Sequence, residues 1–133
     1  MSDFVLIKPE YPKVPDLLLA EIQGFRDSLE YERLNETERR LPGVVGAAFT
    51  RFFIRFQDAE IQGSLTERDA KTLDDAYRAI EILSSSREDQ VRTLVRDEIF
   101  ENVRSSESVW RAIERRLGPR SLDLLKQWRK DTS

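Results

Sequence analysis

The sequence predicts an all-α fold: an irregular bundle of five to six helices, preceded by an extended, proline-containing N-terminal arm. Through most of the 133 residues, apolar side chains recur at spacings of three and four, which places them on one face of a helix. After residue 10, no alternation of apolar and polar residues is long enough to indicate a strand. The length fits one domain, so we expect a single helical domain over residues 16–133, with the arm over residues 1–15.

The arm differs from the rest of the chain in its proline content. Three of the five prolines lie in it, namely Pro9, Pro12 and Pro15. Proline has no amide hydrogen to donate and disfavours a helical conformation in the residue before it. We therefore expect extended backbone here, with the apolar residues 4–7 packed against the body of the domain.

A first helix is expected to begin with Asp16 as its N-cap, because a carboxylate can accept a hydrogen bond from the unpaired amides of the first turn. Its apolar stripe consists of Leu17, Leu18, Ile22, Phe25 and Leu29. Gly24 lies within this stripe and lowers the helix propensity only modestly. A break or bend is expected at Asn35 or Thr37.

The second helix is expected to begin at Pro42, because the amide that proline lacks would be unpaired in a first turn. It should run to about Gln62 and end with Gly63 as its C-cap. Four apolar residues in it are spaced by four, three and four, namely Val45, Phe49, Phe52 and Phe56. They share one helical face, and aromatic residues at this spacing are typical of a core.

A third helix follows a capping box, in which a hydroxyl residue precedes a carboxylate by three positions. Two overlapping segments fit this pattern, residues 64–67 and residues 66–69. The helix is expected to end at the triple-serine turn of residues 84–86.

Three more helices are expected, each opened by a serine. Ser86 together with Asp89 can open the fourth helix, and Ser106 can cap the fifth. The segment Leu117–Pro119 is a stop signal, because glycine and proline follow the last apolar residue. Ser121 can then cap a short last helix.

The residue types that are missing limit the chemistry that the chain can perform. It has no histidine and no cysteine, which removes the commonest general base and metal ligand together with the strongest nucleophile. The five glycines are scattered, so there is no glycine-rich phosphate loop. We expect a protein that is not an enzyme, binds neither a cofactor nor a metal, and acts by binding a partner.

Hydropathy and net charge set the expected location. No apolar run approaches the roughly 20 residues that a transmembrane helix needs. The first three residues lack the positive charge of a secretory signal. With 22 basic and 25 acidic residues, the net charge of -3 is not that of a globally basic nucleic-acid binder. We therefore expect no membrane contact, no nucleic acid and a cytoplasmic location.

Charge is unevenly distributed along the chain. Residues 57–101 contain 12 acids and 6 bases, whereas residues 102–133 contain 8 bases and 4 acids. The two blocks could attract each other within the fold, or the acidic block could attract a basic protein partner. For the second reading, the candidate partner-binding residues are Asp74, Asp75, Tyr77, Glu81, Glu88, Asp89, Asp97 and Glu101.

Two other functions stay open. Glu98 and Glu101 lie one helical turn apart, as a magnesium-dependent nucleotide hydrolase requires, although no second pair of acids follows them at helical spacing. The basic C-terminal residues could instead contact nucleic acid in a regulatory domain. The candidates there are Arg104, Arg111, Arg115, Arg116, Arg120, Arg129 and Lys130, with Trp110 and Trp128.

Three segments resemble landmarks of a family of small, all-helical bacterial proteins of unknown function. They are Leu41–Phe52, Val91–Glu101 and Leu117–Pro119, and the resemblance therefore spans residues 41–119 without covering the arm. Small proteins of this kind often accompany polymorphic toxins as immunity proteins. The resemblance implies an all-helical fold that binds and neutralises a cognate toxin, and it carries over no catalytic residue.

Overall fold

The computed structural model describes residues 7–132, and this part of the chain contains helices and no strand. The helices are α1 (Val14–Glu21), α2 (Leu29–Glu32), α3 (Pro42–Ile61), α4 (Glu67–Ser84), α5 (Asp89–Leu94), the π-helix η3 (Val95–Phe100), α6 (Glu101–Val103), α7 (Glu107–Arg116) and α8 (Pro119–Thr132). Two short 3-10 turns are η1 (Tyr11–Lys13) and η2 (Glu38–Arg40). The predicted all-α class is confirmed. Among the described residues, no helix is both long and apolar enough to cross a membrane.

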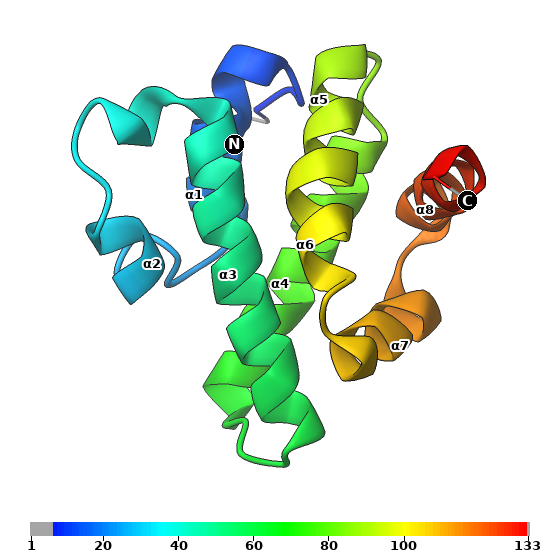
Figure 1. Ribbon diagram of the computed structural model, residues 1–133. Helices are drawn as coiled ribbons and strands as arrows, with labels where there is room; N and C mark the ends of the chain where they lie inside the picture. Colours follow the sequence, from blue (N-terminus) through cyan, green and yellow to red (C-terminus); the bar gives the residue numbers. More distant parts are fainter. Residues whose placement is uncertain (1–6, 133) are drawn as a thin grey trace, which may run out of the picture.

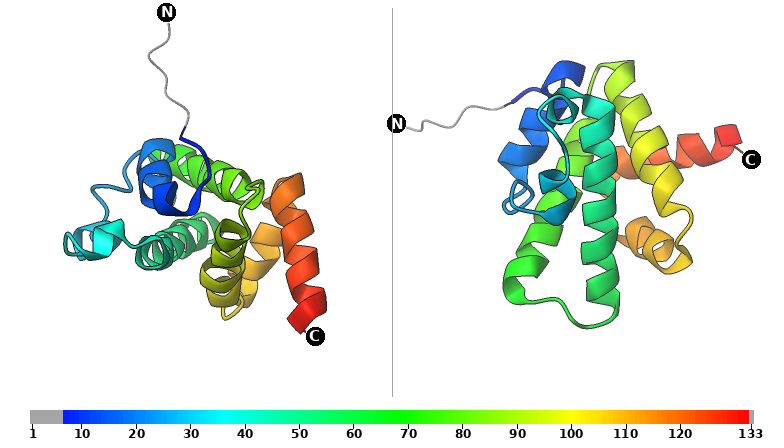
Figure 2. Two further views of the ribbon diagram at one scale, coloured as in Figure 1. Left: turned by 90° about the horizontal axis from the view of Figure 1, so that it is seen from above. Right: turned by 60° about the vertical axis from the view of Figure 1, so that its left-hand side comes forward.

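The centre of the molecule is the antiparallel pair α3 and α4 (Figure 1). On one side, α1 packs against both of these helices. On the other side, α5, η3 and α6 form one continuous helix that runs along α3, and α8 contacts α4 (Figure 2). Counting this continuous helix once gives seven helices, against the predicted five to six, because the short α2 had not been expected.

The core is built around phenylalanine rings from α3, as predicted. Phe49, Phe52 and Phe53 are buried, whereas Phe56 is only partly buried at the edge of the core. The ring of Phe25 fills the space beside them, with its centroid 6.0 Å from that of Phe49 and 5.2 Å from that of Phe52. Burial of four aromatic rings in one cluster supplies a large apolar contribution to stability.

The N-terminal region differs from the prediction in three places. Residues 11–13, expected to be extended, form the 3-10 turn η1, and Pro12 fits its first turn because no amide donor is needed there. The first helix begins at Val14 rather than Asp16, and Asp16 lies exposed in its first turn, where a carboxylate suits the helix dipole. The helix also ends at Glu21, because Ile22 adopts an extended conformation, and Gly24 with a φ of 91° then turns the chain. Ile7 packs against the core, and residues 4–6 of the predicted apolar segment lie outside the described residues.

The capping predictions are confirmed at two helices and wrong at two others. Thr66 caps α4 by accepting a hydrogen bond from the Asp69 amide at 3.1 Å, so the second of the two overlapping boxes is used. Ser106 caps α7 as expected. Ser86 does not cap α5, because its hydroxyl oxygen accepts from the Glu88 amide, which precedes the helix, while the hydroxyl donates to the Pro9 carbonyl oxygen. Ser121 does not begin α8 either, since that helix starts at Pro119.

The π-helix η3 follows from the spacing of the buried residues in this part of the chain. Val91, Val95, Ile99 and Val103 recur at steps of four and are all buried. Steps of four drift around a regular α-helix, which has 3.6 residues per turn. The wider π-turn, with its i→i+5 hydrogen bonds, cancels this drift. All four side chains therefore stay on the face that packs into the core.

Candidate functional site

The structure divides the predicted acidic face between two helices. Asp74, Asp75, Tyr77 and Glu81 belong to α4, whereas Asp89, Asp97 and Glu101 belong to the continuous α5–η3–α6 helix, and Glu88 directly precedes it. The sequence prediction treated these eight residues as one surface. Five of them prove to have contacts inside the fold, and we describe those five first.

Asp74 and Asp75 take part in ion pairs of the protein itself. The Asp74 carboxylate accepts a hydrogen bond from the guanidinium of Arg116 on α7. Asp75 is buried, and its carboxylate lies 3.2 Å from the guanidinium of Arg78. Asp75 is therefore hidden from a partner, and Asp74, although its side chain is 61% exposed, already pairs within the fold.

Tyr77 is a core residue and not an anchor at the rim of a docking face. It is buried, and its hydroxyl donates a hydrogen bond of 2.5 Å to the Gln57 side-chain oxygen. Burial raises the pKa of the Tyr77 hydroxyl, because the phenolate would lose its hydration. The guanidinium of Arg116 stacks over the ring, 4.5 Å from its centroid. The prediction that Tyr77 contacts a partner is therefore wrong, because the sequence did not reveal that this side chain is buried.

Glu81 and Glu88 hold other segments of the chain in place. The Glu81 carboxylate accepts hydrogen bonds from the amides of Arg120 and Ser121 and from the Ser121 hydroxyl, so it caps the start of α8. Burial by itself would raise the pKa of Glu81, but these hydrogen bonds outweigh it and the pKa is lowered. Glu88 accepts a hydrogen bond of 2.8 Å from the Tyr11 amide and so fastens the N-terminal segment to the fold.

The three remaining predicted residues, Asp89, Asp97 and Glu101, are exposed along the α5–η3–α6 helix. They are separated by multiples of four residues, and Glu98 lies next to Asp97 on the same helix. We call Asp89, Asp97, Glu98 and Glu101 the acidic ridge. The carboxylates of Asp97, Glu98 and Glu101 make no hydrogen bond or ion pair within residues 7–132, whereas Asp89 lies 3.5 Å from the guanidinium groups of Arg92 and Arg96.

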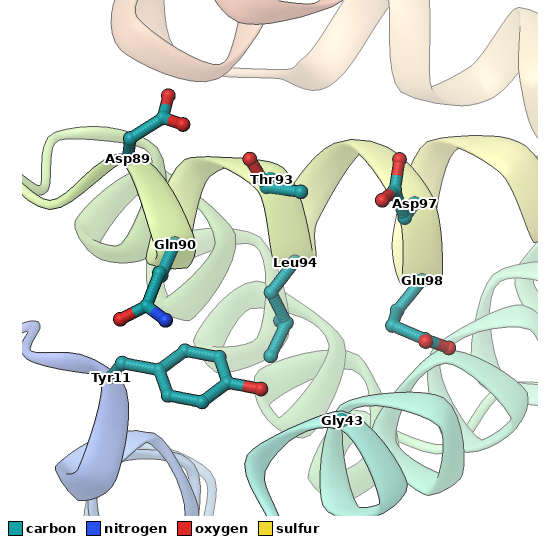
Figure 3. Close-up of a pocket in the computed structure, with 8 residues that line it drawn as sticks. All are labelled: Tyr11, Gly43, Asp89, Gln90, Thr93, Leu94, Asp97 and Glu98. Carbon is teal, nitrogen blue, oxygen red and sulfur yellow. The ribbon is translucent and has the colours of Figure 1, made fainter.

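A groove of about 300 Å³ runs beside this ridge. Figure 3 shows that six of its lining residues come from α5 and η3, and that Tyr11 from η1 and Gly43 from α3 form the opposite wall. The six are Asp89, Gln90, Thr93, Leu94, Asp97 and Glu98. Asp89, Thr93 and Asp97 point to one side of the helix, whereas Gln90, Leu94 and Glu98 point to the side of Tyr11 and Gly43 (Figure 3).

Sequence reasoning identified the carboxylates of this site but not its walls. The two rows of side chains are visible in the sequence as steps of four, 89–93–97 and 90–94–98. Tyr11 and Gly43 are distant from them in the chain and reach the groove only through the tertiary fold. No sequence pattern could have placed them there.

The structure also places the residues proposed for a magnesium site and for nucleic-acid binding. Glu98 lines the groove, whereas Glu101 does not, and residues 7–132 contain no group of three or more acids placed to hold a metal ion. At the basic end, Trp110 and Trp128 pack together with ring centroids 5.8 Å apart. Arg104 lies over the ring of Trp128, so both tryptophans contribute to packing.

Comparison with known proteins adds no relative. No protein-family model, no curated protein and no solved structure matches this chain significantly.

Proposed function

We propose that this chain is a non-enzymatic protein-binding protein, an immunity protein that binds and neutralises a cognate bacterial toxin with a basic surface. The observation that carries the proposal is the acidic ridge, where three carboxylates have no partner among residues 7–132, whereas Asp74, Asp75 and Glu81 of α4 are engaged within the fold. Unpaired like charges in a row repel one another. A complementary basic surface would relieve that repulsion.

Such a ridge suits rapid and selective association. Complementary charge raises the rate of encounter and disfavours partners of the wrong sign. The ridge lies on the continuous α5–η3–α6 helix, which packs against α3, so its carboxylates are held in fixed relative positions. Neutralisation would then follow from covering the toxin's active site or its substrate-binding surface, in the cytoplasm where we place the encounter.

A growth-rescue assay tests this proposal. The protein is expressed together with the product of the gene next to its own, and growth is compared with that of cells expressing the neighbouring product alone. We expect the neighbour to be toxic alone and harmless in the presence of this protein. Toxicity that persists with the wild-type protein, or a harmless neighbour, would remove the basis of the proposal.

Charge reversal then tests the ridge itself. The variant Asp97→Lys/Glu101→Lys is expected to lose rescue, because two exposed carboxylates are replaced by groups that repel a basic partner. The matched control is Glu32→Lys/Glu36→Lys, which makes the same charge change at exposed positions on α2 and the loop after it. Circular dichroism should show that both variants are folded. Equal rescue by both variants would exclude the ridge as the binding surface.

Reversal at Asp74 and Asp75, the positions that the sequence indicated, would be a poor test of binding. Those carboxylates pair with Arg116 and Arg78, so their reversal would disturb the fold as well as any interface.

A further inference from the structure

The groove beside the ridge combines an apolar floor with an opening above it. Leu94 is almost completely buried at its base, and the ring of Tyr11 lies along the opposite wall (Figure 3). Gly43 leaves space there, because a Cβ atom added to it would have no neighbour within 4 Å. The groove can therefore hold an aliphatic chain against Tyr11 and Leu94.

The charge of the groove is negative. Glu98 projects to the same side of the helix as Leu94 (Figure 3), and its carboxylate has no partner among the described residues. No lysine or arginine lines the groove. Arg92 and Arg96 lie on the same helix, but their guanidinium groups donate hydrogen bonds to Asp89, Ser86 and Thr93.

The size of the groove indicates what it can take. Its volume of about 300 Å³ is at the lower end of the range for small-molecule sites. That space suits one long side chain better than a nucleotide or a large cofactor. An apolar floor that leads to a carboxylate matches a side chain with an apolar stem and a charged tip.

We infer that the groove receives a lysine or arginine side chain of the partner protein, with its stem against Tyr11 and Leu94 and its cationic tip at Glu98. The face of the Tyr11 ring adds a favourable cation–π contact. This inference rests on the proposed function, since the side chain comes from the basic partner. It makes the groove an anchoring pocket, and the acidic ridge the charged rim around it.

The test uses the full-length protein and probes that need no knowledge of the partner. N-acetyl-lysine N-methylamide and N-acetyl-arginine N-methylamide are titrated into ¹⁵N-labelled protein and followed by NMR. We expect weak, saturable binding, with the largest shifts at the amides of Gly43, Leu94 and Glu98. The norleucine analogue, which has a similar stem without the charge, should bind at least about tenfold more weakly, as loss of a charge-assisted contact predicts.

Variants separate the groove from general electrostatic attraction. Glu98→Gln should weaken the lysine probe, whereas Glu32→Gln, with the same charge change at an exposed position on α2, should leave its affinity nearly unchanged. Gly43→Leu should block binding by filling the space, and Gly43→Ala should weaken it less. Both glycine substitutions also favour the α3 helix, so loss of folding is not expected.

Three results would overturn the inference: no saturable shift up to tens of millimolar probe, equal binding of the norleucine analogue, or equal effects of Glu98→Gln and Glu32→Gln. Larger shifts with magnesium chloride than with the lysine probe, at matched ionic strength, would assign the groove to a metal ion and also overturn it. The proposed function has its own readout in growth rescue. Rescue by the wild-type protein without probe binding would reject the anchoring pocket alone.

Discussion

At the scale of single residues, the role of each glutamate depends on which backbone amides are near it. Glu81 and Glu98 are both helical glutamates of the acidic block, yet Glu81 caps α8 through three hydrogen bonds and Glu98 has no partner among the described residues. Gly118 shows how closely Glu81 fits. A Cβ atom at Gly118 would lie 2.7 Å from the Glu81 carboxylate, so glycine is required for this cap.

The Glu81 cap predicts a pH dependence of stability. The pKa of Glu81 is lowered from its ordinary value of 4.5 in the folded protein, because the amides and hydroxyl of α8 bind the carboxylate form. A group whose pKa is lower in the folded protein than in the unfolded chain stabilises the fold. This contribution is fully present above the pKa of the unfolded chain, and it is lost as the pH falls through the pKa of the folded protein. Glu81→Gln should therefore cost about 1 kcal/mol at neutral pH, as loss of a helix cap does, and less in acid.

Urea unfolding followed by circular dichroism at several pH values would measure this difference. Glu32→Gln is the matched control, because Glu32 is exposed on α2. A difference between wild type and Glu81→Gln that stays constant down to strongly acidic pH would contradict the capping role.

At the scale of elements, one arginine of α7 contacts both central helices, in addition to the apolar face that α7 buries. The Arg116 guanidinium lies 2.8 Å from the Glu60 carboxylate of α3, pairs with Asp74 of α4, and stacks on the ring of Tyr77. The three contacts come from two different helices, so a single side chain fixes the end of α7 against both. Arg111, on the same helix, has only a local ion pair with Glu107, four residues earlier.

Arg116→Ala should therefore destabilise the protein by about 1–2 kcal/mol, since charge-assisted hydrogen bonds at a half-exposed site are lost together with stacking. Arg111→Ala should cost about 0.3–0.5 kcal/mol, as for an exposed pair within one helix. Chemical denaturation of both variants would measure these losses. Hydrogen exchange should also show faster opening of α7 in Arg116→Ala alone, and equal effects of the two substitutions would contradict the proposed attachment.

At the scale of the whole molecule, one aromatic cluster joins segments that are far apart in the sequence. Phe25 follows the end of α1 and is fully buried against Phe49 and Phe52 of α3, and it also contacts Tyr31 of α2 at a centroid distance of 5.4 Å. The turn at Gly24 directs Phe25 into this position. The irregular stretch between α1 and α2 is therefore part of the core and not a peripheral loop.

Phe25→Ala should destabilise the fold by about 3–5 kcal/mol, because a large buried ring is removed and a cavity remains. Leu29→Ala is the matched control, since Leu29 is a nearby apolar residue that is 56% exposed, and substitutions at such surface sites usually change stability by less than about 0.5 kcal/mol. Thermal and urea unfolding would measure both. Similar losses for the two variants would contradict the central position of Phe25.

The uneven distribution of acidic and basic residues along the chain can also be examined at the scale of the whole molecule. On α4, Asp74 and Glu81 contact residues of α7 and α8, so this part of the acidic block attracts the basic end within the fold. On the α5–η3–α6 helix, the acids face outward instead. Attraction within the fold therefore accounts for part of α4, and the docking of a basic partner stays a prediction for the α5–η3–α6 helix.

The sequence by itself determined the helical class, the extent of α3 and α4, the phenylalanine core and the stop at Leu117–Pro119, because these depend on local spacing and on residues next to one another. It did not determine where α1 ends, since the apolar spacing continues through Ile22 and Phe25, which the fold buries outside the helix. Nor could it separate Glu81 from Asp97, because a carboxylate's role depends on which distant amide or guanidinium lies beside it. The groove between Tyr11, Gly43 and Glu98 was decided by the tertiary structure alone, since its walls come from three segments that only the packed fold brings together.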